Sequence, residues 1–191
     1  FREGRNAEAK KLIGRLAADL VDDGDVIYID SGTTTMHMVP YLLDKQRLTI
    51  VTASVHVINM AVTYTRLNVI STGGTFYAPS QSFIGPQAVE CLRRYNVTKA
   101  FLASTGISIE HGATNTSPLE CELKQSLMKK NCPHILLVDD SKFDHATLMS
   151  YCALKDLEYV VTNKRPSDAY LRYFDENDVR LIAPTQTIIN G

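Results

Sequence analysis

The sequence has a run of small polar residues directly after the apolar stretch at residues 26–29, and it reads Asp30-Ser31-Gly32-Thr33-Thr34-Thr35. Glycine lets the backbone approach a ligand closely, and hydroxyl groups together with the free amide groups of a helix start attract anions. Phosphate and carboxylate groups are the ligands that such a loop suits. The same residue types also cap helices without binding a ligand, so a plain helix cap is the alternative interpretation.

Three further short loops of similar character follow other apolar stretches, and they read Thr52-Ala53-Ser54, Gly73-Gly74-Thr75 and Ser104-Thr105-Gly106. Each loop taken alone is also explained by a helix cap or a turn. A single cap or turn does not explain why four successive predicted strands each end in glycine or hydroxyl-bearing residues. We therefore expect the loops to meet in one crevice, with these additional candidate ligand-binding residues: Thr52, Gly73, Gly74, Thr105 and Gly106.

Charged residues at two places complete the candidate site. Glu120 and Lys124 stand four residues apart on a predicted helix, where a surface pair would contribute about 0.2–0.5 kcal/mol. In the alternative interpretation, the Lys124 ammonium lies over the crevice and balances an anionic ligand, while Glu120 binds a hydroxyl. Lys142, shortly after the apolar stretch at residues 135–138, is either a second cation for the ligand or a solvated turn lysine.

Several motifs of enzymes and metal sites are absent from the sequence. It contains no GxGxxG, GxxxxGK[ST], GxSxG or HExxH string, and no obvious pair of a nucleophile and a base. The five histidines lack metal-ligand spacing, and only His37, just after the threonine run, is a candidate near the site. We therefore predict no catalytic residue, no metal site and no cofactor.

The elements that must position these residues alternate along the chain. Apolar runs of strand length occur at residues 26–29, 48–51, 67–70, 100–103, 135–138, 159–161 and 179–182. Segments with helical spacing lie at residues 6–22, 35–44, 54–65, 85–95, 118–131 and 168–177. This alternation predicts an α/β fold with a mostly parallel sheet and helices on both faces, which binds its ligand at the carboxyl ends of the strands.

Length and composition limit the class of protein. A chain of 191 residues fits a single domain, which we place at residues 1–191. The 20 Lys and Arg residues against 21 Asp and Glu residues exclude a strongly basic nucleic-acid binder. The apolar runs are too short to span a bilayer, and the four cysteines are widely separated. We expect a cytoplasmic protein without membrane contact or disulfides.

Six strings, in this order, carry a resemblance to a known family. They are residues 23–34, Val51-Thr52, Gly73-Gly74 with residues 82–86, Thr105-Gly106-Ile107, Glu120 with Lys124, and Asp139 with Ser141-Lys142-Phe143. On these strings the chain resembles, over nearly its whole length, the C-terminal effector-binding domain of DeoR-family transcriptional repressors of sugar metabolism. The chain departs from the family pattern in three ways: Ala53 replaces a frequent Asn, Asp144 replaces a usual Gly, and the residues before Gly106 are Ser104 and Thr105.

The resemblance implies a fold like that of ribose-5-phosphate isomerase, the coenzyme A transferases and glucosamine-6-phosphate deaminases. It also implies a phosphorylated sugar effector. Carried over by position, the residues that hold the phosphate or its neighbouring hydroxyls are Asp30, Gly32, Thr33, Thr34 and Thr35, while Glu120 and Lys124 face the sugar. Family members carry a winged helix-turn-helix before this domain, and we expect that domain to be absent from this chain.

Our leading hypothesis is a non-enzymatic sensor whose bound sugar phosphate modulates DNA binding by the N-terminal domain. Operator DNA is then bound only by that N-terminal domain. We also expect a homo-oligomer, because operators are usually bound by symmetric proteins. The alternative is a sugar-phosphate isomerase or deaminase in which Glu120 and Lys124 perform acid–base chemistry. A purely structural oligomerisation domain is a third possibility.

Overall fold

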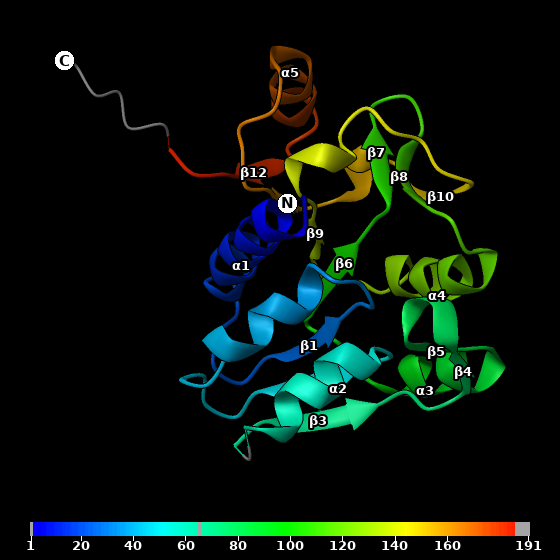
Figure 1. Cartoon of the computed structure of the whole chain (residues 1–191). Coiled ribbons are helices and arrows are strands. Elements are labelled where there is room, and N and C mark those ends of the chain that lie inside the picture. The colour runs from blue at the N-terminus through cyan, green and yellow to red at the C-terminus, as the bar shows by residue number, and fades with distance from the viewer. Residues whose placement is uncertain (1, 65, 186–191) are drawn as a thin grey trace.

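Seven parallel strands form the central sheet of the molecule (Figure 1). The computed structural model describes residues 2–64 and 66–185. In chain order the strands are β1 (Val26–Ile29), β2 (Thr49–Thr52), β3 (Asn68–Ser71), β6 (Lys99–Ala103), β9 (His134–Leu137), β11 (Tyr159–Val161) and β12 (Arg180–Ile182). Their order across the sheet is β12-β11-β9-β6-β1-β2-β3, and each neighbouring pair is parallel. The seven apolar runs of the sequence thus became strands, with ends that differ by at most one residue from those predicted.

Helices cover both faces of this sheet. On one face lie α1 (Arg2–Ala18), η1 (Thr35–Tyr41) and α2 (Val55–Val62), whose apolar side chains pack in one cluster with Ile27 and Ile29. On the other face lie α3 (Pro86–Arg94), α4 (Pro118–Met128) and α5 (Asp168–Glu176), in one cluster with Tyr28. Because successive side chains of a strand point to opposite faces, β1 must be apolar throughout. The predicted α/β fold is confirmed.

Two small antiparallel sheets were not predicted from the sequence. Strands β7 (Gly106–Ser108), β8 (Gly112–Asn115) and β10 (Met149–Cys152) form a sheet in the order β10-β8-β7. Strands β4 (Thr75–Tyr77) and β5 (Ser82–Ile84) form a hairpin that includes the short helix η2 (Ala78–Ser80). These strands are three or four residues long and mostly small or polar, so they carry no clear hydrophobic alternation.

The helix expected at residues 35–44 is a 3₁₀ helix and ends at Tyr41. Pro40 lies inside it, and proline lacks the amide hydrogen that an α-helix interior requires. The expected helix at residues 6–22 ends at Ala18, before the turn at Gly24, which has a φ of 81°. Among the described residues, no helix is long and apolar enough to cross a membrane.

An ion-pair cluster ties the amino ends of β1 and β6 together, on the edge of the sheet opposite the strand-end loops. Lys99 Nζ lies 2.7 Å from carboxylate oxygens of both Asp22 and Asp25. The side chains of Lys99 and Asp25 are 18% and 12% exposed. Burial is the largest single influence and opposes ionisation of Asp25. The hydrogen bonds from Lys99, the Asp22 amide and Thr98, together with the charge of Lys99, outweigh it, so the net effect lowers the pKa of Asp25 below 3.8.

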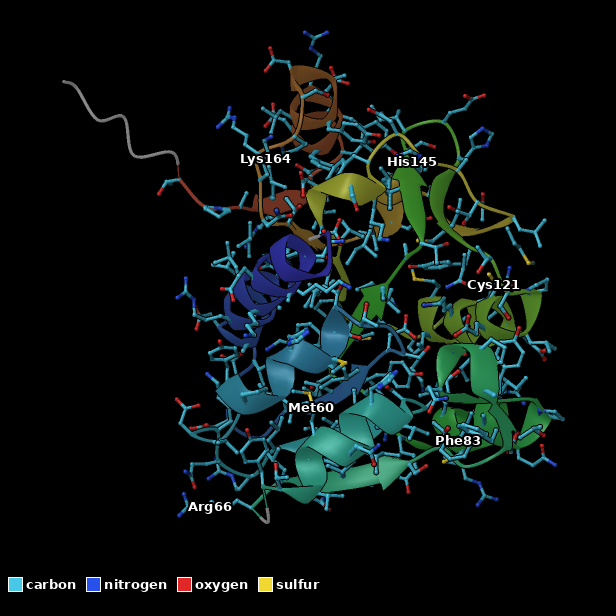
Figure 2. All side chains as sticks on the ribbon, viewed as in Figure 1. Met60, Arg66, Phe83, Cys121, His145 and Lys164 are labelled. Carbon is cyan, nitrogen blue, oxygen red and sulfur yellow. The ribbon has the colours of Figure 1, made fainter. Side chains whose placement is uncertain are left out.

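Replacement of this lysine tests the cluster. Lys99→Met should lower the free energy of unfolding by about 1–2 kcal/mol at about pH 7, because Asp25 then lacks its cation. Since the pKa of Asp25 is lower in the folded state, the contribution is present above about pH 4 and is lost as the pH falls through the folded value. Urea denaturation at about pH 7 and about pH 2 measures both effects. The control is Lys164→Met, at an exposed lysine that is labelled in Figure 2. The role of Lys99 would be contradicted if the stability difference between wild type and Lys99→Met were the same at about pH 2, or if Lys164→Met lost as much stability.

Candidate functional site

A cleft of about 290 Å³ opens at the carboxyl edge of the central sheet. It is bounded by the loops after β1 and β6, the first turns of α2 and α4, η2, and η3 (Asp140–Lys142) after β9. Seven residues selected from the sequence line it, namely Ser31, Gly32, Thr33, Thr34, Thr105, Glu120 and Lys142. Residues from loops far apart in the chain are thus brought together here. The other seven selected residues lie outside the lining, each for its own reason.

The loop of residues 31–34 presents free backbone amides. Gly32 has a φ of 143°, and a Cβ atom there would lie 2.9 Å from Ala103 Cβ, so only glycine fits without strain. Within the described chain, the amide groups of Gly32, Thr33 and Thr34 have no hydrogen-bond partner. Successive unpaired amides form a concave site suited to an anion.

Asp30 lies beneath this loop and is 2% exposed. Its carboxylate accepts hydrogen bonds from the amides of Ser31 (2.8 Å) and Ala103 (2.9 Å) and forms an ion pair with Lys124. The carboxylate is buried and bonded to three protein donors, so it shapes the loop from below, and its contact with the ligand stays a prediction.

Lys124 does not face the cleft, contrary to the interpretation that placed its ammonium over the ligand. It is 1% exposed, and besides Asp30 it donates a hydrogen bond to the Ala103 carbonyl oxygen at 2.9 Å. Its Nζ also lies 5.2 Å from the centre of the Tyr151 ring. Nor does it pair with Glu120, the partner expected for a surface pair on α4. The positive charge of Lys124 is therefore balanced by the Asp30 carboxylate.

Tyr151 of β10 completes the floor of the site. Burial raises the pKa of Tyr151 well above its usual value, so the phenol stays protonated. Its hydroxyl lies 3.0 Å from the Ala103 carbonyl oxygen and 2.7 Å from Ser104 Oγ. The three-stranded sheet therefore supports the carboxyl end of β6.

Glu120 presents its carboxylate to the cleft from the first turn of α4. The hydroxyl of Ser117 caps this helix by accepting a hydrogen bond from the Glu120 amide, at 3.3 Å. Glu120 Oε1 accepts hydrogen bonds from Ser31 Oγ (3.2 Å) and Ser82 Oγ (3.5 Å). A half-buried carboxylate that already accepts from hydroxyl groups is suited to accept from the hydroxyl groups of a sugar.

The hydroxyls of Thr35 and Thr52 are directed at the backbone. Thr35 Oγ1 donates to the Asp30 carbonyl oxygen at 2.7 Å. Thr52 Oγ1 donates to the Ile29 carbonyl oxygen at 2.6 Å and accepts from the Ser54 amide at 3.0 Å. Both threonines are fully buried and outside the cleft lining, where their hydroxyls hold the strand ends, and their contact with the ligand stays a prediction.

The glycines at positions 73, 74 and 106 also lie outside the lining. A Cβ atom at Gly106 would lie 2.4 Å from the carbonyl oxygen of His145, which sits on the loop beside β7 (Figure 2). At Gly74 it would lie 2.7 Å from the Ile84 carbonyl oxygen. At Gly74 and Gly106 the missing side chain permits close packing of backbone on backbone, whereas Gly73 has open space around it and a φ of 62°, which L side chains rarely adopt.

The structure adds cleft residues that the sequence interpretation did not select, namely His56, Pro79, Ser80, Ala103, Ser104, Asn115 and Thr116. His37, the histidine expected near the site, is on η1 beside α1, where burial and the charges of Lys10 and Lys11 lower its pKa. His56 is two residues beyond Ser54, the last residue of the Thr52-Ala53-Ser54 loop, and this proximity was a usable signal. Asn115 and Thr116 had no such signal, because β8 was not predicted.

Comparison with known proteins places the chain among transcriptional regulators. A family model described as "DeoR C terminal sensor domain" matches residues 5–164. The HTH-type transcriptional regulator IolR of Bacillus subtilis (strain 168) is 34% identical over 175 residues, which are 92% of this chain and 70% of that protein. The HTH-type transcriptional repressor GlcR of the same organism is 28% identical over 180 residues, which are 94% of this chain and 69% of that protein.

The fold has relatives among solved structures. Ribose 5-phosphate isomerase A from Methanocaldococcus jannaschii matches with a TM-score of 0.52 and 18% sequence identity. The match covers 72% of this chain and 55% of the isomerase chain, so this chain spans about half of that protein. At this identity the likeness concerns the fold alone, and it agrees with the fold expected from the sequence.

Proposed function

This chain belongs to the DeoR family and contains its C-terminal sensor domain, and on that premise we propose that the cleft binds a phosphorylated sugar. The two relatives found by sequence, IolR and GlcR, are both named as transcriptional regulators. The chain is accordingly the sensing part of a transcriptional regulator and not a catalyst.

The observation that carries the proposal is that free backbone amides and an unpaired lysine line the same cleft. The amides of Gly32, Thr33 and Thr34 have no partner in the described chain, and no described residue forms a hydrogen bond or ion pair with the Lys142 ammonium. Backbone amides and a lysine are common partners of phosphate oxygens. We assign the phosphate to the amide loop, within reach of Lys142.

Glu120 is the residue that we assign to the sugar. Its carboxylate accepts from Ser31 and Ser82 hydroxyls, and a sugar hydroxyl would replace or join them. Thr105 and Ser104 line the same cleft and add hydroxyl groups. A volume of about 290 Å³ suits a small metabolite, since it lies at the lower end of the range for ligand pockets.

The effector acts by shifting a population. A ligand that binds two arrangements of a regulator with different affinity favours one of them, and that shift changes affinity for operator DNA through the N-terminal domain of the complete regulator. We propose that the complete protein is a repressor of sugar metabolism and a homo-oligomer, because operators are usually read by symmetric proteins.

A thermal-unfolding screen tests the proposal. The isolated chain is melted with a panel of phosphorylated sugars and, as matched controls, with the same sugars lacking phosphate. A true effector present at about a hundredfold excess over its Kd should stabilise the fold by about 2.7 kcal/mol, and its unphosphorylated counterpart should not. A chain that responds to no phosphorylated sugar, or equally to both forms, would refute the proposed function.

A further inference from the structure

His56 occupies a distinctive position in the cleft. It lies in the first turn of α2, a helix that Ser54 caps by accepting a hydrogen bond from the Val57 amide at 3.2 Å. The cap holds this turn in place after β2, and His56 is half-buried in the cleft lining. Within the described chain, its imidazole has no hydrogen-bond or ion-pair partner.

The strand order places two basic residues on opposite sides of the amide loop. Lys142 follows β9, residues 31–34 follow β1, and His56 follows β2. Across the sheet these strands run in the order β9-β6-β1-β2. Neighbouring strands lie about 4.8 Å apart, so β9 and β2 are separated by about 14 Å, with the loop between them.

Two lysines near the amide loop do not line the cleft. Lys124 is paired with Asp30 beneath it, and Lys10 of α1 keeps its charge and donates a hydrogen bond to Thr33 Oγ1, with a Nζ–Oγ1 distance of 2.7 Å. Among the described residues that line the cleft, His56 and Lys142 are the basic side chains and Glu120 is the acidic one. An anionic ligand on the loop therefore has Lys142 on one side and His56 on the other.

We infer that His56 contacts the anionic group of the effector from the β2 side and sets the affinity of the cleft for phosphate. The inference rests on the proposed function, because it assigns a second side-chain contact to the same ligand. An imidazole N–H donates to a phosphate oxygen, and a protonated imidazole adds an attractive charge. His56 thus adds to the preference of the cleft for phosphorylated over neutral sugars.

The test measures binding of inorganic phosphate and of the phosphorylated sugars in the panel, by calorimetry in a phosphate-free buffer. His56→Ala should weaken phosphate binding about fivefold, since one partly solvated charge-assisted hydrogen bond is lost. His56→Lys should restore most of the affinity, because a lysine supplies both donor and charge. His37→Ala is the matched control and should bind as the wild type does, because His37 lies outside the cleft lining.

The outcomes separate the two proposals. If the wild-type chain binds neither inorganic phosphate nor any phosphorylated sugar, the proposed function fails. If the wild type binds but His56→Ala binds equally well, the role of His56 fails and the proposed function stands. Equal losses in His56→Ala and His37→Ala, or a loss that His56→Lys does not restore, would show a structural role for His56 and would also overturn the inference.

Discussion

Lys124→Met should lower the free energy of unfolding by about 3–5 kcal/mol, because removal of one partner of a buried ion pair leaves the other charge buried and uncompensated. Asp30 and Lys124 are 2% and 1% exposed, so solvent does not screen the carboxylate that remains. The Ser31 and Ala103 amides still donate to that carboxylate, which places the effect toward the lower end of this range. Urea denaturation of the wild type and the variant measures the difference.

Two companion variants make this result specific. Lys164→Met removes an exposed lysine and should change stability by less than about 0.5 kcal/mol. In the double variant with Asp30→Asn, no buried charge is left alone, and part of the lost stability should return. Two results would mean that the Asp30–Lys124 pair does not hold the site together. One is that Lys124→Met is as stable as Lys164→Met. The other is that the double variant loses the sum of the unfolding free energies lost by the two single variants.

Lys142→Met should weaken binding of the phosphorylated effector by about tenfold to a hundredfold, because a charge-assisted hydrogen bond to phosphate contributes about 1.5–3 kcal/mol. Stability without ligand should change little, since no described residue pairs with the Lys142 ammonium. Titration calorimetry with the sugar phosphate selected by the melting screen gives the two affinities.

The matched control for this variant is Lys155→Met, an exposed lysine on η4 (Leu154–Asp156) that does not line the cleft. It should bind the effector as the wild type does. Lys142→Arg should keep more of the affinity than Lys142→Met, because the positive charge is retained. If Lys142→Met binds the effector unchanged, Lys142 does not contact the phosphate, and the role assigned to it is wrong.

The buried pair also bears on the enzymatic alternative considered from the sequence. That alternative required Lys124 and Glu120 to perform acid–base chemistry on a sugar phosphate. The Lys124 ammonium instead lies beneath the cleft, in contact with Asp30, the Ala103 carbonyl oxygen and the Tyr151 ring. It therefore does not reach a ligand in the cleft, and the named relatives are regulators.

Local patterns made most of the fold predictable. The β1 stretch is apolar at each position because Tyr28 packs in the core on one face of the sheet and Ile27 and Ile29 pack in the core on the other. A strand that is covered on both faces can therefore be predicted from four consecutive residues. Pro118 in the first turn of α4 and the turn at Gly24 were likewise local signals. The strands of the antiparallel sheets lacked such signals, because residues such as those of β8 are small or polar although they are buried.

The site was only half predictable for a related reason. Residue type and position after a strand selected Ser31, Gly32, Thr33, Thr34, Thr105, Glu120 and Lys142, all of which line the cleft. The same reasoning also selected Thr52 and Gly106. The Thr52 hydroxyl donates a hydrogen bond to a backbone carbonyl oxygen, and the missing side chain of Gly106 lets two backbone segments pack closely. A threonine that binds a ligand and one that bonds to a carbonyl oxygen look alike in sequence.

By itself the sequence determined the α/β alternation, the strand-end loops and the family resemblance, because each depends on residues that are neighbours along the chain. Only the tertiary structure decided that Lys124 neutralises Asp30 from 94 positions away, and that His56, not His37, lies in the cleft. The rotation of a helix about its axis and the order of strands in a sheet set those contacts. Both result from the packing of the whole core, so no local stretch of sequence contains them.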